Sequence, residues 1–140
     1  MKLSIASDHA GFDLKESIKS NLSSQGHEIN DLGTYSKDSV DYPDFGKKLA
    51  ENVENGESDF GILVCGTGIG ISIAANRNKN VRCALCHNDQ TAELARQHNN
   101  ANIIALGARI IDDETALSAV KTFLKTEFEG GRHAQRVAKL

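Results

Sequence analysis

The chain has few aromatic residues and almost no proline: its 140 residues include five Phe, two Tyr, one Pro and no Trp. So few aromatic rings offer little surface for stacking bases, and a net charge of −3 argues against the basic face that a nucleic-acid partner would need. We therefore expect no nucleic-acid partner. No apolar run approaches the roughly 18 residues of a membrane span, so we expect no membrane segment. Residues 1–7 are typical of a first strand and not of a leader peptide.

Only three cysteines are present, Cys65, Cys83 and Cys86. An odd number without a leader is typical of reduced thiols, which favours a cytoplasmic location. Cys83 and Cys86 match the C-x-x-C spacing of metal and redox pairs, but they lie in the apolar run 81–86, which predicts a buried strand. Residues three apart on a strand face opposite sides, and no second pair completes a zinc site. We interpret both as core residues.

Short apolar segments alternate along the chain with longer amphipathic ones. The predicted strands are Leu3–Ser7, Glu28–Leu32, Gly61–Cys65, Val81–Cys86 and Asn102–Leu106. Apolar residues recur every fourth position between them, in the two series Leu14, Ile18, Leu22 and Phe45, Leu49, Val53, which predicts helices. The alternation predicts one α/β domain over 1–140, a doubly wound, five-stranded parallel sheet with helices on both faces.

Helix starts are marked by short polar residues. Asp41 is a candidate cap for a helix with Pro43 in its first turn. Asn88 or Asp89 can cap the helix that runs through Gln97, and Asp112 or Asp113 the helix that runs through Lys125.

In such sheets, ligands bind beyond the carboxyl ends of the strands. Polar residues follow three predicted strands there: Asp8-His9 after the first, the loop 65–70 after the third, and Arg109 after the fifth. His87 after the fourth strand is a further possibility. Asp8 and His9 could bind hydroxyl groups or pair with each other, and the alternative is that Asp8 only caps the first helix.

The loop Cys65-Gly66-Thr67-Gly68-Ile69-Gly70 combines a thiol with alternating glycines at the start of a helical pattern. The backbone N–H groups of such a loop and the positive end of the helix can hold an anion, and they favour a thiolate. Cys65 is therefore a candidate base or nucleophile. The dinucleotide motif fails because Ile71 occupies its third glycine position, and the phosphate-loop motif lacks its lysine. A tight turn with a third core cysteine is the alternative.

A second polar set lies at the other edge of the predicted sheet. His98 and Asn99 follow the helix that precedes the last strand, and Arg132 and Arg136 lie in the C-terminal segment 126–140. His98 could transfer protons near neutral pH, and paired guanidinium groups suit a phosphate; with His133 and Arg109 they make a local positive site. The alternatives are a helix-capping histidine and a solvated helix. If both sets serve one site, a neighbouring subunit must supply the second, which predicts an oligomer with shared sites.

We expect no metal site, because the histidines lack ligand spacing and no carboxylate cluster accompanies them.

Taken together, these motifs resemble the ribose-5-phosphate isomerase B family, which belongs to a larger family with the galactose-6-phosphate isomerase subunits. The resemblance covers nearly the whole chain. Its residues are Ser7-Asp8-His9-Ala10-Gly11 with Leu14-Lys15, Asp41-Tyr42-Pro43-Asp44, Cys65 to Gly70, Ile73-Ala74-Ala75-Asn76, Arg96-Gln97-His98-Asn99 and Glu129-Gly130-Gly131-Arg132-His133-Ala134-Gln135-Arg136-Val137.

The resemblance implies an isomerase without metal or other cofactor that interconverts ribose 5-phosphate and ribulose 5-phosphate. Cys65 would be the base, and His98, aided by Asp8, would open the sugar ring. Substrate oxygens would be held by Thr67, the loop 66–70 (Gly66, Gly68, Ile69, Gly70) and Asn99, and the phosphate by His9, Arg109, Arg132 and Arg136. The family is dimeric, sometimes tetrameric, with sites between subunits.

Three other functions remain open from the sequence. A hexose-phosphate isomerase acting on allose or galactose 6-phosphate differs in pocket depth, which sequence does not show. A non-catalytic phosphometabolite-binding module would need the glycine loop and the arginines but neither Cys65 nor His98. A thiol hydrolase would need a His–Asn or His–Asp pair placed to activate Cys65 in the same chain.

Overall fold

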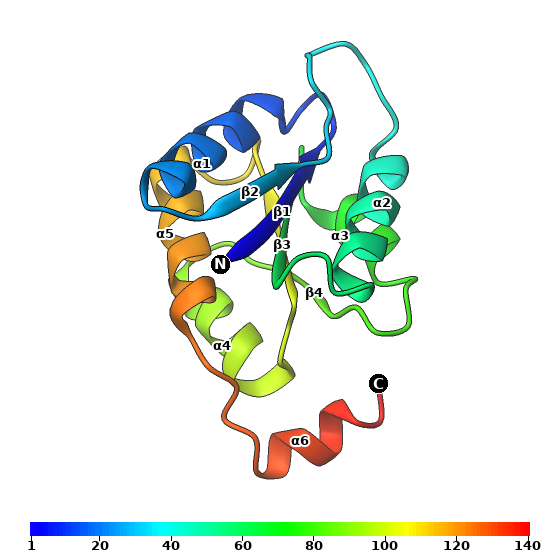
Figure 1. Ribbon diagram of the computed structural model, residues 1–140, viewed down its shortest axis with the longest axis vertical. Helices are drawn as coiled ribbons and strands as arrows, with labels where there is room; N and C mark the ends of the chain where they lie inside the picture. Colours follow the sequence, from blue (N-terminus) through cyan, green and yellow to red (C-terminus); the bar gives the residue numbers. More distant parts are fainter.

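The computed structural model describes all residues 1–140 and contains one wholly parallel sheet (Figure 1). Its strands are β1 (Lys2–Ser7), β2 (Glu28–Asp31), β3 (Phe60–Cys65), β4 (Cys83–Leu85) and β5 (Ile103–Gly107), in the order β2-β1-β3-β5-β4. All five predicted strands are confirmed. The fourth is shorter than its apolar run, because only three residues of 81–86 pair with β5.

Helices cover both faces of the sheet, as predicted. They are α1 (Phe12–Ser24), α2 (Tyr42–Glu54), α3 (Ile69–Ala75), α4 (Asp89–Asn99), α5 (Asp113–Lys125) and α6 (Arg132–Val137). One core cluster joins α1, α4 and α5 to the sheet, and a second joins α2 and α3 to the opposite face. The predicted series Leu14, Ile18 and Leu22 is fully buried in the first cluster, where each side chain contributes about 1.5–3 kcal/mol.

The predicted caps differ in what they do. The Asn88 side chain accepts a hydrogen bond from the Thr91 amide at 2.9 Å, and Asp112 accepts one from the Thr115 amide at 2.8 Å. Asp41 does occupy the cap position of α2, but its side chain makes no capping bond. Pro43 lies in the first turn of that helix, as expected.

The edge strand β4 confirms the interpretation of the C-x-x-C pair. Cys86 lies in one core cluster and Cys83 packs against the other. Burial raises the pKa of both thiols, that of Cys86 to about 11, so neither is a reactive thiolate near neutrality. The Asn76 side chain pairs with the backbone of Cys83, donating to its carbonyl at 2.9 Å and accepting from its amide at 2.7 Å. This amide therefore covers part of an otherwise open sheet edge.

A buried lysine joins α1 to β2. Lys15 is fully buried, and its Nζ lies 2.7 Å from a carboxylate oxygen of Asp31 and 2.9 Å from one of Glu16. Lys19 contacts the same Asp31 oxygen at 2.8 Å. The burial of Lys15 is possible because its charge is paired at both carboxylates.

The two ends of the sheet differ in what covers them. In Figure 1 the strand arrowheads point to the end where the loop 33–41 lies, whereas α6 lies beyond the opposite end. No helix is both long and apolar enough to cross a bilayer.

Candidate active site

The candidate site begins at the point where the strand order reverses. From β1 the chain continues to β2 on one side, while β3, β5 and β4 lie on the other. The loops after β1 and β3 therefore diverge and leave a crevice at the carboxyl edge, where open α/β sheets bind ligands. The Asp8 amide donates to the Val64 carbonyl at 3.2 Å, which brings Asp8 beside the end of β3.

Cys65 ends β3 with its thiol turned into the glycine loop. The Gly68 amide donates to Cys65 Sγ at 3.1 Å, and Cys65 is only 4% exposed. Gly68 adopts a φ of +79°, which a residue with a side chain rarely takes. A Cβ there would also lie 2.9 Å from the Leu106 backbone carbon. The conformation that directs this amide at sulfur thus requires glycine.

The sequence suggested that all the amides of the loop could hold an anion, but two of them are bonded within the chain. The Gly68 amide is used by Cys65, and the Ile69 amide donates to Thr67 Oγ1 at 3.1 Å. The remaining amides, those of Gly66, Thr67, Gly70 and Ile71, make no hydrogen bond within the chain. Because Thr67 Oγ1 accepts the Ile69 bond, its own hydroxyl proton is left to donate elsewhere.

Asp8 and His9 do not pair with each other. Asp8 is 7% exposed and accepts a hydrogen bond from the Gly11 amide at 3.0 Å in the turn before α1; the cap position itself is Gly11, so Asp8 does not cap the helix as the alternative interpretation proposed. His9 Nδ1 accepts from the Val40 amide at 3.2 Å, which ties the loop 33–41 to the crevice. Since Nδ1 is an acceptor, the proton of the neutral ring lies on Nε2.

Arg109 lies near the start of the glycine loop, at Gly66, and Tyr42 near its end, at Gly70. The Arg109 amide donates to the Gly66 carbonyl at 2.9 Å, and a Cβ on Gly66 would be 3.3 Å from the guanidinium group. Arg109 makes no ion pair within the chain, so its charge is available to an anion. Tyr42 had no predicted role, yet a Cβ on Gly70 would meet its ring at 2.5 Å. Its only sequence signal was its place in the run 41–44.

His87 follows β4 but is exposed, and only its backbone amide is bonded, to Thr91 Oγ1 at 3.1 Å.

The second predicted set lies at the opposite end of the sheet. His98 and Asn99 end α4, and Arg132 and Arg136 lie on α6, beyond the amino ends of the strands (Figure 1). A small cavity of about 280 Å³ is lined there by His98, Asn99, His133, Arg136, Val137 and Leu140. A strand of six residues spans about 20 Å, so the chain by itself does not bring this set to Cys65.

Arg96 holds the second set together, a role the sequence did not reveal. It is 8% exposed, and its guanidinium group donates to the carbonyls of Thr126 at 3.1 Å and Ala101 at 2.6 Å. Burial, and then the charge of Arg82, lowers its pKa. The Glu129 amide also donates to the Gln97 carbonyl at 3.1 Å. These bonds fasten the segment after α5 to the end of α4.

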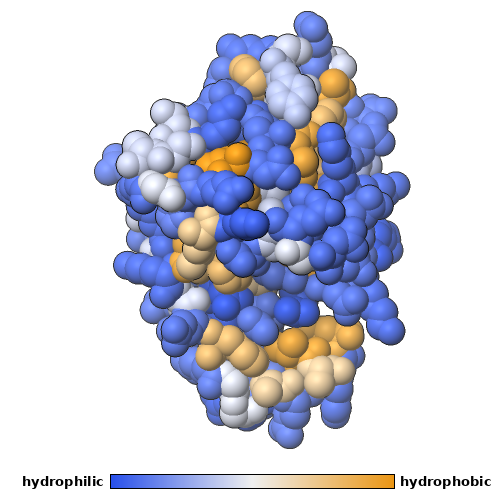
Figure 2. Space-filling model, viewed as in Figure 1, coloured by the Kyte–Doolittle hydropathy of each residue, from blue (hydrophilic) through white to orange (hydrophobic).

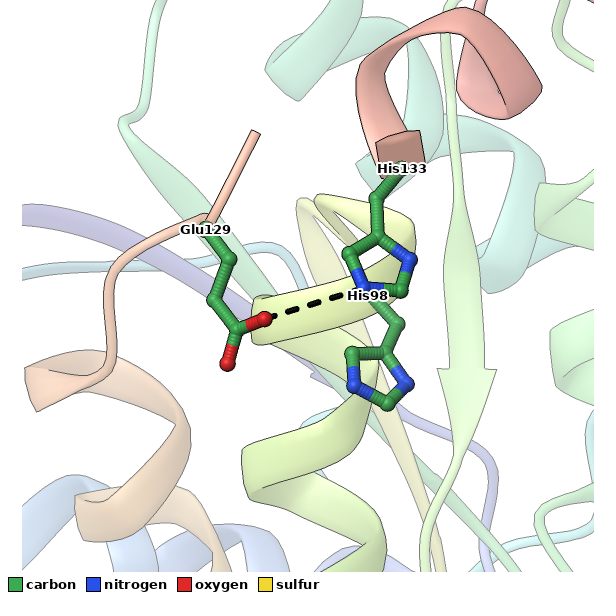
Figure 3. Close-up of side chains that lie close together, drawn as sticks. All are labelled: His98, Glu129 and His133. Carbon is green, nitrogen blue, oxygen red and sulfur yellow. Dashed lines mark ion pairs between the residues drawn. The ribbon is translucent and has the colours of Figure 1, made fainter. Parts of the chain in front are cut away.

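Figure 3 shows the rings of His98 and His133 stacked, with Glu129 directed at His133. The ring centroids are 4.2 Å apart at an interplanar angle of 12°, and His133 Nε2 lies 3.6 Å from a Glu129 oxygen. Burial, then the charges of His98 and Arg132, lowers the pKa of His133. Two histidines and a carboxylate thus converge, although their spacing along the chain is not typical of metal ligands.

The fold and this crevice define a doubly wound α/β protein in which a buried thiol lies beside unbonded loop amides at the reversal of strand order. Residues 3–140 match the sequence profile of the family described as Ribose/Galactose Isomerase. The chain belongs to this family.

Known members are similar over nearly their whole length. Ribose-5-phosphate isomerase B of Escherichia coli strain K12 is 45% identical over 136 residues, covering 97% of this chain and 91% of its own. The structure of Clostridium thermocellum ribose-5-phosphate isomerase B is 54% identical with a TM-score of 0.98, covering 99% and 94% of the two chains. That of the Mycoplasma genitalium enzyme with bound ribulose-5-phosphate is 45% identical with a TM-score of 0.94, covering 99% and 92%.

Proposed function

We propose that this chain is an aldose–ketose isomerase that interconverts D-ribose 5-phosphate and D-ribulose 5-phosphate, with Cys65 as the base. The observation that carries the proposal is the buried Cys65 Sγ, which accepts the Gly68 amide at 3.1 Å beside the unpaired Arg109. A fixed donor holds the sulfur in place, and a buried sulfur base is suited to removing a proton next to a carbonyl. The structure of a relative with bound ribulose-5-phosphate supports the substrate.

The reaction needs one base that acts twice. Cys65 takes the proton from C2 of the open aldose, which leaves an enediolate, and then returns a proton to C1 while the proton on O2 passes to O1. The negative charge on the enediolate oxygens is met by the free loop amides and the free hydroxyl of Thr67. Each such donor, correctly placed, contributes about 10²–10³-fold in rate.

The phosphate would lie at the cationic groups. His9 offers the N–H of Nε2, because its Nδ1 is occupied by the Val40 amide. Arg109 contributes from the same chain, and Arg132 and Arg136 from a partner subunit. The phosphate is distant from C1 and C2, so its binding energy can hold these carbons at the sulfur.

His98, with Asp8, would open the furanose ring, and Asn99 would contact sugar oxygens. Asp8 already uses one carboxylate oxygen to accept the Gly11 amide, so the other oxygen is the one available to substrate.

We further propose that two protomers build each site, with residues 126–140 reaching the partner in a dimer or tetramer. Two surfaces support this. A groove of about 850 Å³ lies between α6 and the region of α3 and β4; it is lined by residues such as Val81, Ala84 and Val137. Figure 2 shows apolar residues gathered beside a hollow on this part of the molecule. Ile69, Ile73 and Ile110, near the glycine loop, are each more than half exposed.

We place the enzyme in the cytoplasm, because all three cysteines are free.

A coupled assay of ribose 5-phosphate isomerisation with a chelator present tests the activity. We expect turnover with chelator, and a Cys65→Ala variant that loses about 10²–10⁴-fold in kcat. Substrate deuterated at C2 should slow the parent enzyme. Preference for galactose or allose 6-phosphate over ribose 5-phosphate would contradict the assigned substrate, and an active Cys65→Ala would contradict the assigned base.

Mixing two inactive variants tests the shared site. A Cys65→Ala protomer and a His98→Asn protomer that exchange subunits would form one intact site per mixed dimer. About a quarter of parental activity should then return, since half of the dimers are mixed and each has one intact site of two. No recovery after demonstrated subunit exchange would show that both residues act within one chain or in different sites.

A further inference from the structure

We propose that His98, Glu129 and His133 of one chain form a binding site for a divalent transition-metal ion of the zinc and cobalt class. All three ligands come from a single protomer, in which they lie at the opposite end of the sheet from that chain's own Cys65. Its consequence for catalysis rests on the proposed function: a bound ion would occupy His98 and inhibit ring opening.

The spacing of the three groups supports the site. Their ligand atoms all lie within 4.8 Å of one another, and His133 Nε2 is 3.6 Å from a Glu129 oxygen. Ligands about 2.0–2.2 Å from a tetrahedral zinc ion lie roughly 3.3–3.6 Å from one another. The His133–Glu129 pair is therefore already at the required separation. The third ligand, His98, must move inward by about 1–1.5 Å to reach the same separation.

His98 and its neighbours can make this movement. The two rings lie nearly parallel at 12°, so their nitrogen lone pairs do not yet meet at one point (Figure 3). Rotation of one ring about its Cβ–Cγ bond corrects this, and that torsion is soft. The His98 side chain makes no hydrogen bond that would resist it. Glu129 precedes Gly130 and Gly131, around which a Cβ would meet nothing within 4 Å, so its segment has space to adjust.

The donor set selects the metal. Two imidazoles and one carboxylate suit zinc, cobalt, nickel and copper, whereas magnesium and calcium prefer oxygen ligands alone. Three protein ligands leave a fourth position for water, and the 280 Å³ cavity adjoins the two histidines. Arg132 and Arg136 lie nearby and repel a cation, and only Glu129 compensates them. We therefore expect micromolar and not nanomolar affinity.

Cobalt gives the most direct test, because its visible absorption reports tetrahedral coordination and thiolate ligation adds a separate near-ultraviolet band. Untagged protein in the Cys65→Ser background, which removes the competing thiol, is titrated with cobalt and then with zinc, which displaces it. We expect Glu129→Gln and His133→Ala to weaken binding at least tenfold. The matched control is Glu127→Gln, which removes the same charge from the same exposed segment and should leave binding unchanged.

Equal affinity in Glu129→Gln and Glu127→Gln would overturn the site. A cobalt spectrum that shows only octahedral or thiolate coordination would also overturn the site. The absence of cobalt binding up to millimolar concentration would overturn it as well. Thermal unfolding provides a second measurement: zinc should raise the Tm of the parent and of Glu127→Gln, but not that of Glu129→Gln.

Activity separates this inference from the proposed function. Without metal, Glu129→Gln should turn over ribose 5-phosphate like the parent, and it should tolerate at least tenfold more cobalt before inhibition. Metal binding at these residues without any inhibition would refute the effect on His98. A parent chain without isomerase activity would refute the proposed function, while the spectroscopic titration would still decide the site.

Discussion

Replacing Gly68 with alanine should damage both the stability and the activity of this protein. Gly68 has a φ of +79°, and left-handed backbone costs alanine about 1–2 kcal/mol. A Cβ at this position would lie 2.5 Å from a Leu85 side-chain carbon and 2.9 Å from the Leu106 backbone carbon. Leu85 can move, but the β5 backbone cannot move without disturbing the sheet, and such overpacking costs about 1–3 kcal/mol. The free energy of unfolding should fall by about 2–5 kcal/mol.

Gly26→Ala is the matched control. Gly26 has a φ of +89°, but a Cβ there would meet nothing within 4 Å. It should therefore cost only the backbone strain, and the reduced entropy of the unfolded chain is the same in both variants. Urea unfolding at one fixed protein concentration measures the difference, expected at about 1–3 kcal/mol.

The two variants should also differ in activity. Alanine at 68 displaces the amide that donates to Cys65 Sγ, so kcat should fall about 10²-fold while Gly26→Ala stays near the parent. If Gly68→Ala is no less stable than Gly26→Ala, the steric reasoning about β5 is wrong. If it is unstable but fully active when folded, the hydrogen bond from the Gly68 amide to Cys65 Sγ does not contribute to catalysis.

Three further outcomes follow from named contacts. Burial alone would raise the pKa of Asp31, but the hydrogen bonds from Lys15 and Lys19 outweigh it and hold this pKa below its ordinary value. A carboxylate whose pKa is lowered in the folded state stabilises the protein above the unfolded pKa of about 3.8, and this stabilisation is lost as the pH falls further. The free energy of unfolding of Asp31→Asn, measured by urea titration at pH 2–6, should therefore fall less steeply at low pH than that of the parent. Lys15→Ala should cost about 3–5 kcal/mol, since it leaves a cavity and removes a buried pair, and Lys15→Met, which keeps most of the side-chain volume, should cost less in the same assay. Arg96→Met removes the hydrogen bonds to the carbonyls of Thr126 and Ala101, so backbone amides in residues 97–101 and 126–133 should exchange faster while those of the sheet stay unchanged. Amide exchange in these two segments at the parental rate would refute the fastening role of Arg96.

The sheet and its helices could be predicted because their signals are local. The series Leu14, Ile18, Leu22 repeats with the period of a helix, and the run 61–65 has the length of a buried strand, so burial could be assigned before any contact was known. The opposite orientation of Cys83 and Cys86 followed from the two-residue period of a strand. The fourth strand was overestimated, because the apolar run extends from Val81 to Cys86 whereas the register with β5 covers only residues 83–85.

The separation of the polar residues into two sets was also predicted from topology, since parallel strands place their carboxyl ends at one edge. The roles of individual atoms could not be predicted in this way. The orientation of the Cys65 thiol toward one amide, the acceptor role of His9 Nδ1 and the position of Tyr42 over Gly70 depend on φ angles and side-chain rotamers. Residue spacing does not specify these angles.

The sequence by itself determined the strands, the helices, their order and the edge of the sheet at which the glycine loop lies, because hydrophobic period and turn chemistry act over a few neighbouring residues. Only the tertiary structure decided that His98, Glu129 and His133 meet, and that Arg96 fastens the C-terminal segment to α4. These residues belong to separate segments, and packing and buried hydrogen bonds, not spacing along the chain, determine their distances.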